Sequence, residues 1–216
     1  MQSKILNEAF ITGCDSNTEW MLPWFIENFK KYNQSKLLVY DFGMTPEMCT
    51  QVELVADGVY NLSFIHEKGW FKKPKAMISS PSIKTIWLDT DIQILDNIDN
   101  LFSKLVLNKL SMVEDKPWTM RRGEVWHNSG LVGFINKPDI LKAWAQQVEK
   151  NPQVGDQEVL HSMLDPFSKM TYINDIPNEY NVLRLQTEID NYQGPIKAMH
   201  WTGRKGKEKI RSLINE

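Results

Sequence analysis

Short apolar runs alternate with amphipathic segments in the first half of the chain. Four of these runs have the length and the branched or aromatic content of β-strands. They cover residues 9–12, 36–40, 59–65 and 83–88. Between the first two runs, residues 19–32 have apolar positions at helical spacing and are predicted to form a helix. One face of this helix would carry the aromatic side chains Trp20, Trp24, Phe25 and Phe29. Strands that alternate with helices predict an α/β fold with a mainly parallel sheet.

Helix start and stop signals separate the later strands. Thr45, Pro46 and Glu47 form an N-cap, a proline at the first helical position and an acidic first turn, and this predicted helix stops near Gly58. Another predicted helix opens at residues 73–78. The run at 83–88 is largely apolar, which predicts a strand that is buried on both faces.

The second half continues the alternation with a less regular pattern. Further strands are predicted at residues 111–114 and 130–135 and helices at 138–150 and 156–164. Residues 170–174 are predicted as a last short strand, and the chain from Pro177 onward is predicted to be rich in loops. With 216 residues in total, the chain has the size of one domain with a single core.

Charge and cysteine content narrow the class of protein. The net charge of −2 gives no general electrostatic attraction to nucleic acid, so no nucleic-acid partner is expected. Cys14 and Cys49 are not spaced as zinc ligands or as a disulfide framework, which favours a reducing compartment. The N-terminus has no apolar signal-peptide core, and no apolar run approaches the roughly 20 residues that span a bilayer. We therefore expect a cytoplasmic protein without a membrane span.

The strongest chemical signal is Asp89-Thr90-Asp91, directly after the buried strand at 83–88. In an extended segment, residues i and i+2 point to the same side, so both carboxylates can share one hard cation. Ligands of doubly wound sheets also bind at the carboxyl ends of strands. The alternative is a solvated turn with capping aspartates, because this spacing arises about once by chance in such a chain.

Three polar clusters follow downstream, and each also has an ordinary structural explanation. Asn128 and Ser129 precede an apolar strand, where they are either sugar contacts or a loop. Asp156 and Gln157 open a helix, where Asp156 is either a cap or a carboxylate aimed at a sugar. His200 is followed by glycines and cations that suit a metal and a diphosphate, although a basic, frayed terminus is equally typical.

Taken together, these features resemble glycosyltransferase family 8 and related GT-A enzymes, glycogenin among them. The resemblance covers most of the chain, and the matching segments are residues 10–12, Lys73, 86–91, 97–102, 128–130, 156–157 and 200–207. The family's closing segment is His-x-x-Gly-x-x-Lys-Pro-Trp. Here Gly206 occupies the lysine position, Lys205 and Lys207 flank it, and Pro-Trp is missing.

The resemblance implies a single GT-A-type, Rossmann-like α/β domain with a mainly parallel central sheet, flanking helices and a small additional antiparallel part. It implies a nucleotide-binding half at 1–95, and a sugar and acceptor half at 96–216 that ends in a closing segment. The implied reaction moves a sugar from a nucleoside diphosphate sugar, with UDP favoured, to a glycan or a protein-linked sugar. Mn²⁺ or Mg²⁺ is the implied cofactor.

The resemblance also implies residue roles. Asp89, Asp91 and His200 would bind the metal, and Asn128 and Ser129 the sugar. Asp156 and Gln157 would be the catalytic pair. The implied nucleotide contacts are Thr12, Gly13, Lys73, Thr90, Gly203, Lys205 and Lys207. We also expect the C-terminal segment to be mobile without nucleotide and to close over it, with Gly194, Gly203 and Gly206 as hinges.

Several alternatives stay open at this point. If the enzyme retains anomeric configuration, the protein needs no general base; if it inverts, Asp156 is the first candidate base, ahead of Glu124 and Asp115. A non-catalytic domain that binds nucleotide sugars or glycans would use tryptophans for stacking, with Trp70, Trp126 and Trp201 as candidates. A sugar nucleotidyltransferase is disfavoured because residues 13–15 lack an arginine-bearing, glycine-rich loop. An aspartate-nucleophile phosphatase is disfavoured because its motif is Asp-x-Asp-x-Thr/Val, and here Gln93 occupies the last position.

Overall fold

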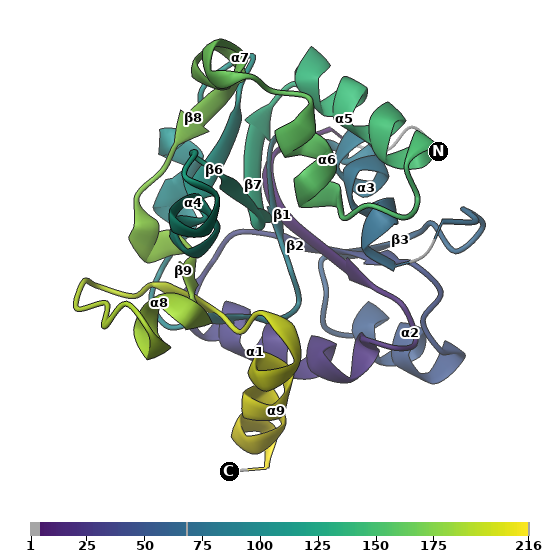
Figure 1. The fold of residues 1–216 in the computed structure, drawn as a ribbon. Coiled ribbons are helices and arrows are strands. Elements are labelled where there is room, and N and C mark those ends of the chain that lie inside the picture. Colours follow the sequence, from purple (N-terminus) through teal and green to yellow (C-terminus); the bar gives the residue numbers. More distant parts are fainter. Residues whose placement is uncertain (1–4, 68, 216) are drawn as a thin grey trace.

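A seven-stranded sheet forms the centre of the molecule in the computed structural model, which describes residues 5–67 and 69–215 (Figure 1). The order of its strands is β3-β2-β1-β4-β7-β6-β8. Their bounds are β1 (Leu6–Cys14), β2 (Leu37–Asp41), β3 (Gly58–Asn61), β4 (Ser82–Leu88), β6 (Leu110–Glu114), β7 (His127–Ile135) and β8 (Ile173–Asp175). All neighbouring pairs are parallel except the two that involve β7, which runs antiparallel to β4 and β6.

A second, three-stranded sheet lies beside the first. It has the order β5-β10-β9 and consists of β5 (Ile92–Ile94), β9 (Val182–Leu183) and β10 (Ala198–His200). The β10 strand is antiparallel to β5 and parallel to β9. The predicted fold class, a mainly parallel central sheet in an α/β domain with a small additional part, is confirmed.

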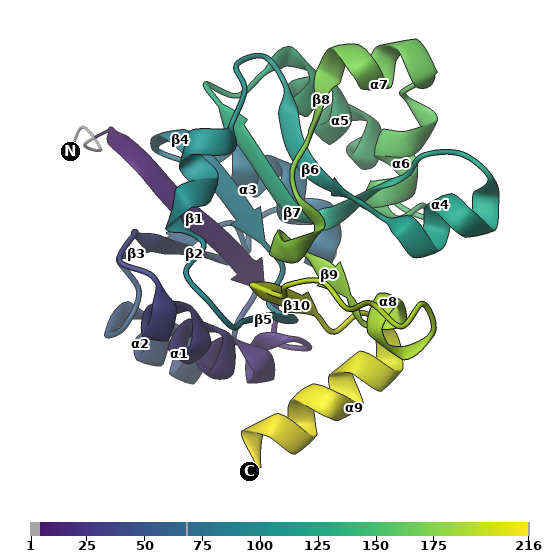
Figure 2. The same ribbon diagram turned by 90° about the vertical axis from the view of Figure 1, so that its left-hand side faces the viewer.

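Helices cover both faces of the large sheet (Figures 1 and 2). The helices are α1 (Leu22–Tyr32), α2 (Pro46–Glu53), α3 (Lys73–Ser79), α4 (Lys116–Arg122), α5 (Asp139–Lys150), α6 (Asp156–Ser162), α7 (Pro166–Tyr172), α8 (Arg184–Glu188) and α9 (Gly203–Ile214). Short 3-10 helices are η1 (Glu19–Met21), η2 (Gly69–Lys72), η3 (Asp99–Lys104) and η4 (Asn178–Tyr180). In both views α9 projects away from the body of the molecule.

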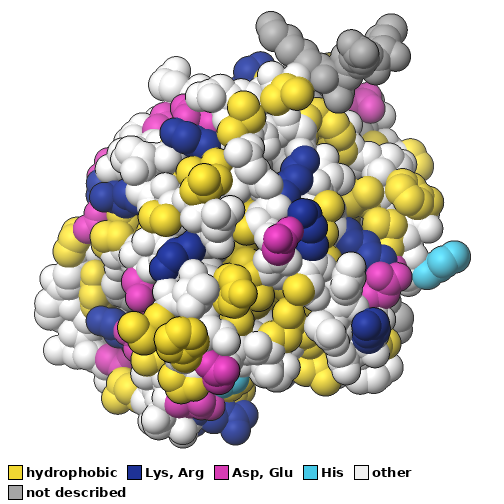
Figure 3. Space-filling view, turned by 90° about the horizontal axis from the view of Figure 1, so that it is seen from above, with side chains coloured by type: hydrophobic (Ala, Val, Ile, Leu, Met, Phe, Trp, Pro, Cys, Tyr) yellow, Lys and Arg dark blue, Asp and Glu magenta, His cyan; other side chains and the backbone are white. Residues whose placement is uncertain are grey.

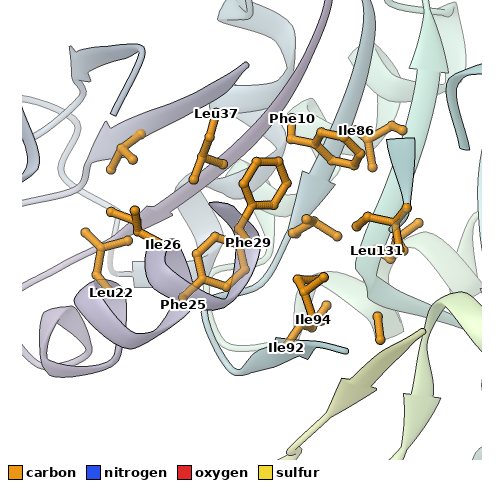
Figure 4. Packing of buried hydrophobic residues seen from close by; sticks show 14 of the residues in the cluster. Phe10, Leu22, Phe25, Ile26, Phe29, Leu37, Ile86, Ile92, Ile94 and Leu131 are labelled. Carbon is orange, nitrogen blue, oxygen red and sulfur yellow. The ribbon is translucent and has the colours of Figure 1, made fainter. Parts of the chain in front are cut away.

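The alternation of side chains along β1 divides the core into two layers. Phe10 faces α1 and meets Phe29 edge to face, with ring centroids 5.1 Å apart (Figure 4). Ile11 points to the opposite face, where its cluster includes Trp144 of α5 and Met77 of α3. Because successive strand residues point to opposite faces, a strand covered by helices on both sides is buried on both faces, as predicted for β4. Residues 85–88 of β4 are buried, whereas Ile83 near its start is exposed.

Most helix boundaries follow the predicted signals. Thr45 caps α2, since its Oγ1 accepts a hydrogen bond from the Met48 N–H at 3.3 Å, and Pro46 is the first helical residue. The helix ends at Glu53, earlier than predicted, and the predicted strand at 59–65 is shorter and ends at Asn61.

Two predictions for the C-terminal third are wrong. Residues 170–172 are the end of α7, and only 173–175 form a strand, because Asp165 caps a helix there by accepting from the Ser168 N–H at 2.8 Å. The chain after Pro177 is also more regular than predicted, with β9, α8, β10 and α9. The β9 and β10 strands are too short to show an alternation of apolar and polar residues in the sequence. The α9 helix is so polar that few positions, such as Ile210, mark its apolar face.

Surface charge and helix length bear on the expected partners. The face in Figure 3 intersperses acidic and basic side chains with uncharged ones, with no basic stripe of the kind that nucleic acid selects. Within residues 5–67 and 69–215, no helix has both the length and the apolar content required to cross a bilayer.

Candidate active site

The carboxyl edge of the large sheet gathers the predicted polar residues. Asp89 follows β4, and its N–H donates to the carbonyl of Gly130 in β7 at 2.8 Å. Because β7 is antiparallel to β4, its first residues lie at the same edge as the last residue of β4. Asp115 follows β6 at this edge. Asn128 and Ser129 are thus brought next to the Asp-x-Asp segment, although about 40 residues separate them in sequence.

Asp89, Asp91 and His200 form a cluster that can hold a metal ion. One ligand atom from each lies within 4.8 Å of the others. His200 Nε2 lies 3.1 Å from Asp91 Oδ1 and 4.0 Å from Asp89 Oδ2. Ligands at ~2.1 Å from an octahedral ion are ~3.0 Å apart when adjacent and ~4.2 Å apart when opposite. The three side chains therefore fit an ion such as Mg²⁺ or Mn²⁺ with little movement.

Two lysines neutralise the carboxylates of this cluster. Lys73 is buried, and its Nζ forms ion pairs with Asp89 Oδ1 at 3.2 Å and Asp156 Oδ2 at 2.9 Å. Lys207 Nζ lies 2.7 Å from Asp91 Oδ2. Lys73 thus joins the metal cluster to the start of α6.

Burial and charge act in opposite directions on these groups. Burial raises the pKa of Asp91, but His200 and Lys207 outweigh it and hold that pKa well below its usual range. Burial raises the pKa of Asp89 above its usual value, although Lys73 opposes the rise. Burial alone would lower the pKa of Lys73, and the carboxylates of Asp156 and Asp89 raise it instead. The cluster favours a cation at Asp91 and keeps Lys73 charged.

Side-chain amides beside the cluster form a connected network. Asn128 Nδ2 donates to Asp115 Oδ2 and to Gln157 Oε1, both at 3.1 Å. Gln157 Oε1 also accepts from the Ser129 N–H at 3.1 Å, and Gln157 Nε2 donates to Asp115 Oδ2 at 3.0 Å. Since a backbone N–H can only donate, the Ser129 contact fixes which Gln157 atom is the oxygen. The buried Asp115 therefore orients both predicted sugar-facing amides.

The same network reaches the metal cluster through Asn181, which the sequence analysis missed. The Gly130 N–H donates to Asn128 Oδ1, so that atom is the oxygen, and Asn181 Nδ2 donates to it at 2.9 Å. Asn181 must then present Oδ1 to His200 Nδ1, at 3.1 Å. His200 Nδ1 therefore donates to Asn181, and this bond orients the ring so that Nε2 faces Asp91 and can serve as a metal ligand when an ion is bound.

Replacing Asn181 by alanine is expected to weaken Mn²⁺ binding about 10–100-fold, the usual cost of removing a partner that orients a metal-binding histidine. Titration calorimetry with Mn²⁺ measures this directly. Asn174→Ala is the control, because Asn174 also donates two hydrogen bonds, to the Lys104 carbonyl and to Ser111 Oγ, but has no contact with His200. Equal Mn²⁺ affinity of both variants would contradict the assigned role.

Close packing explains the glycine at 130. A Cβ atom at this position would collide with the ring of His200, so β7 can pass behind the histidine only with glycine there. Gly206 has a comparable constraint, because a Cβ would collide with the backbone of Trp201. Gly206 is thus a buried packing position inside α9, which argues against its predicted use as a hinge.

Two adjoining cavities open onto the metal cluster. The first, of about 420 Å³, is lined by the end of β1 and the loop after it, including Gly13 and Asp15, and by Trp87, Thr90 and Lys207. The second, of about 330 Å³, is lined by the residues of the amide network and of α6, and by Trp118, Gly203 and His200. Trp70, Lys73, Asp89 and Asp91 line both cavities, so the metal cluster lies at their junction.

Some of the other predicted residues take positions that differ from expectation. Thr12 is fully buried and is not among the residues that line either cavity in the described chain. Lys205 is exposed, whereas Lys207, two residues later, contacts Asp91. Gly203 begins α9 with a φ of +72°. The structure therefore brings Lys207 to the cluster, and not Lys205.

The three tryptophans proposed for stacking have different surroundings. Trp126 is buried and stacked on His161, and it is not among the described residues that line either cavity. Trp201 donates through its Nε1 to Gln93 Oε1 at 3.0 Å. Trp70 is exposed and lines both cavities, and of the three it is the one placed to stack on a ligand.

Solved glycosyltransferases share this fold. The chain is similar to the glycosyltransferase GlyE of Streptococcus pneumoniae TIGR4, with a TM-score of 0.69 and 16% identity over 92% of this chain and 55% of GlyE. It is similar to LgtC, with a TM-score of 0.66 and 14% identity over 96% of this chain and 95% of LgtC. Mouse xyloside xylosyltransferase 1 gives a TM-score of 0.59 and 11% identity over 90% of this chain and 97% of that one.

These similarities concern the fold, since the identities are low. They confirm the GT-A-type fold implied by the sequence motifs. The chain spans only about half the length of GlyE, whereas it spans nearly all of LgtC. No protein-family model matches the sequence, and no curated protein matches it.

Proposed function

We propose that this protein is a metal-dependent glycosyltransferase that moves a sugar from a nucleoside diphosphate sugar, with UDP favoured, to an acceptor hydroxyl. The observation that carries the proposal is the position of the Asp89, Asp91 and His200 cluster at the junction of two cavities. A diphosphate at this junction would have room for a nucleoside on one side and a sugar on the other. The fold adds support, because LgtC, solved with donor and acceptor sugar analogues, has the same architecture.

The division of the chain follows the two cavities. The nucleoside belongs in the first cavity, which residues from 1–95 line except for Lys207. The sugar belongs in the second, where residues from 96–216 supply most of the lining. Among these, Gln157 is held by Asp115 and keeps one Nε2 hydrogen for a sugar hydroxyl. Asn128 already donates two hydrogen bonds and accepts two within the protein, so its contact with a sugar would exchange one of them.

Asp89, Asp91 and His200 would hold Mn²⁺ or Mg²⁺ through two carboxylates and one imidazole nitrogen. When bound, the ion would neutralise charge that develops on the departing diphosphate. Lys207, already at Asp91, is placed to contact the same charge, and the α9 helix that carries it is the proposed closing segment. Asp156 pairs with Lys73 at 2.9 Å and lines the second cavity, where its carboxylate would stabilise positive charge on the anomeric carbon.

A thermal-shift screen of nucleotide sugars with and without Mn²⁺, followed by assays of donor hydrolysis, tests the proposal. The correct donor should raise the melting temperature only when Mn²⁺ is present, because a ligand that binds the native state stabilises it by mass action. Slow release of the nucleoside diphosphate should accompany it. A donor that binds but is turned over neither with an acceptor nor with water would favour the alternative, a non-catalytic binding domain.

Lys207→Ala is expected to weaken UDP binding in the presence of Mn²⁺ by about tenfold, whereas Lys205→Ala should leave it within twofold. A charge-assisted hydrogen bond to a phosphate contributes about 1.5–3 kcal/mol, and about 1.4 kcal/mol corresponds to a factor of ten. The two lysines lie two residues apart in α9, but only Lys207 lines the first cavity. Calorimetric titration with UDP separates them, and equal losses would contradict the assignment of Lys207.

A further inference from the structure

A groove between α4 and α8 lies next to the second cavity and has no role in the function proposed above. It has a volume of about 260 Å³ and is lined by Pro117, Met120, Arg121, Leu185, Ile189 and Asp190. The two helices pack against each other, and they lie side by side in both ribbon views (Figures 1 and 2). Four of its six lining residues are apolar.

The groove adjoins the sugar cavity, since Pro117 and Leu185 line both the groove and the second cavity. A group attached to a sugar in that cavity would reach the groove by passing over these two residues.

Both walls of the groove are fixed to the site itself. The α4 helix is capped by Asp115, whose Oδ1 accepts from the Trp118 N–H at 3.1 Å while its Oδ2 accepts from Asn128 and Gln157. The α8 helix follows β9, the strand paired with β10, and Arg184 Nε donates to the Thr202 carbonyl at 3.1 Å. The groove thus keeps a defined position relative to His200 and the sugar-facing amides.

Two large apolar side chains in the groove remain in contact with water. Met120 from α4 is 72% exposed and Ile189, directly after α8, is 71% exposed. Removing such surface from water is favourable, and an apolar ligand group between them would do so on two sides at once. The charged Arg121 and Asp190 also line the groove, where they suit a polar rim.

We propose that the groove binds an apolar group attached to the acceptor sugar, so that the acceptor is a glycoside with an alkyl or aryl aglycone. This inference rests on the proposed sugar transfer. It adds that acceptor sugars with an apolar aglycone bind better than the same sugars alone.

Saturation-transfer NMR with methyl and hexyl β-D-glucopyranoside as probes tests the groove without requiring turnover. The hexyl chain should receive saturation from the native protein, and hexyl glucoside should bind about tenfold more tightly than methyl glucoside. The double variant Met120→Ser, Ile189→Ser should lose this difference. Phe167→Ser on α7 is the control, because Phe167 is equally apolar and 78% exposed but is not in the groove.

Equal hexyl saturation in the native protein and the double variant would overturn the proposal, and so would equal affinity of the two glucosides for the native protein. Donor hydrolysis with Mn²⁺ is measured in the same variants and should not change. If donor hydrolysis is absent from the native protein while the hexyl effect is present, the proposed transfer fails and the groove remains a binding site. If hydrolysis is present and the hexyl effect absent, only the groove assignment fails.

Discussion

Replacing Asp91 by asparagine is expected to reduce Mn²⁺-dependent donor hydrolysis on the order of 10³-fold. Asp91 is the best placed of the three candidate ligands, because His200 and Lys207 both face it, at 3.1 and 2.7 Å. Neutral asparagine keeps the size of the side chain and removes the charge that attracts the ion. Metal ions contribute several kcal/mol to such reactions, and about 1.4 kcal/mol corresponds to a factor of ten in rate.

Asp96→Asn is the matched control for this prediction. Asp96 lies five residues later, with its side chain 61% exposed and its nearest cation, Lys197, at 3.8 Å. Mn²⁺ affinity, measured by electron paramagnetic resonance, should fall in Asp91→Asn and stay unchanged in Asp96→Asn. If the Asp91→Asn variant still binds Mn²⁺ and hydrolyses the donor at an unchanged rate, the Asp91 carboxylate is not a metal ligand.

Much of the fold could be predicted from local sequence patterns. The β1, β2 and β4 strands are apolar runs of ordinary length, and α2 has a complete start signal in Thr45 and Pro46. The reversal of β7 could not be predicted, because an apolar run has the same pattern in either direction. The small additional part was implied by the resemblance, but its strands β9 and β10 were not located in the sequence, since they have only two and three residues.

The candidate site divides in a similar way. Asp89, Asp91, Asn128, Gln157 and His200 were predicted through motif spacing, and the structure brings their side chains into one connected region. Their partners were harder to identify because the contacts span long stretches of sequence and the partner types are common. The Asn181 amide lies 53 residues from Asn128, with no motif around it that would have signalled this contact.

Lys73 has a structural role that the sequence did not predict. The sequence resemblance placed it near the nucleotide. The structure shows a buried Nζ that bridges Asp89 and Asp156 and also donates to the Ser129 carbonyl at 3.1 Å. It still lines both cavities, so a contact with a bound ligand remains part of the proposal. Through its ion pairs with Asp89 and Asp156, Lys73 stabilises the site in the absence of a metal ion.

Replacing Lys73 by methionine is therefore expected to lower the free energy of unfolding by about 3–5 kcal/mol in the absence of metal. Methionine fills a similar volume but leaves two carboxylates at the site without their shared cation, and breaking a buried ion pair typically has this cost. Urea denaturation measures the change. Saturating Mn²⁺ should reduce the difference, because an ion at Asp89 supplies part of the missing positive charge.

Lys75→Met controls for the loss of a lysine from the same helix. Lys75 pairs with Glu67 and with Glu149, but its side chain is partly exposed, so the loss should stay within about 1 kcal/mol. Mn²⁺ should not affect the stability of this variant differently from the native protein, because Lys75 does not line either cavity in the described chain. If Lys73→Met and Lys75→Met lose equal stability, or if Mn²⁺ restores neither, then Lys73 does not substitute for a cation at this site. If Lys73→Met loses much stability and Mn²⁺ partly restores it, then both the Lys73 ammonium and the bound metal ion stabilise the Asp89 carboxylate.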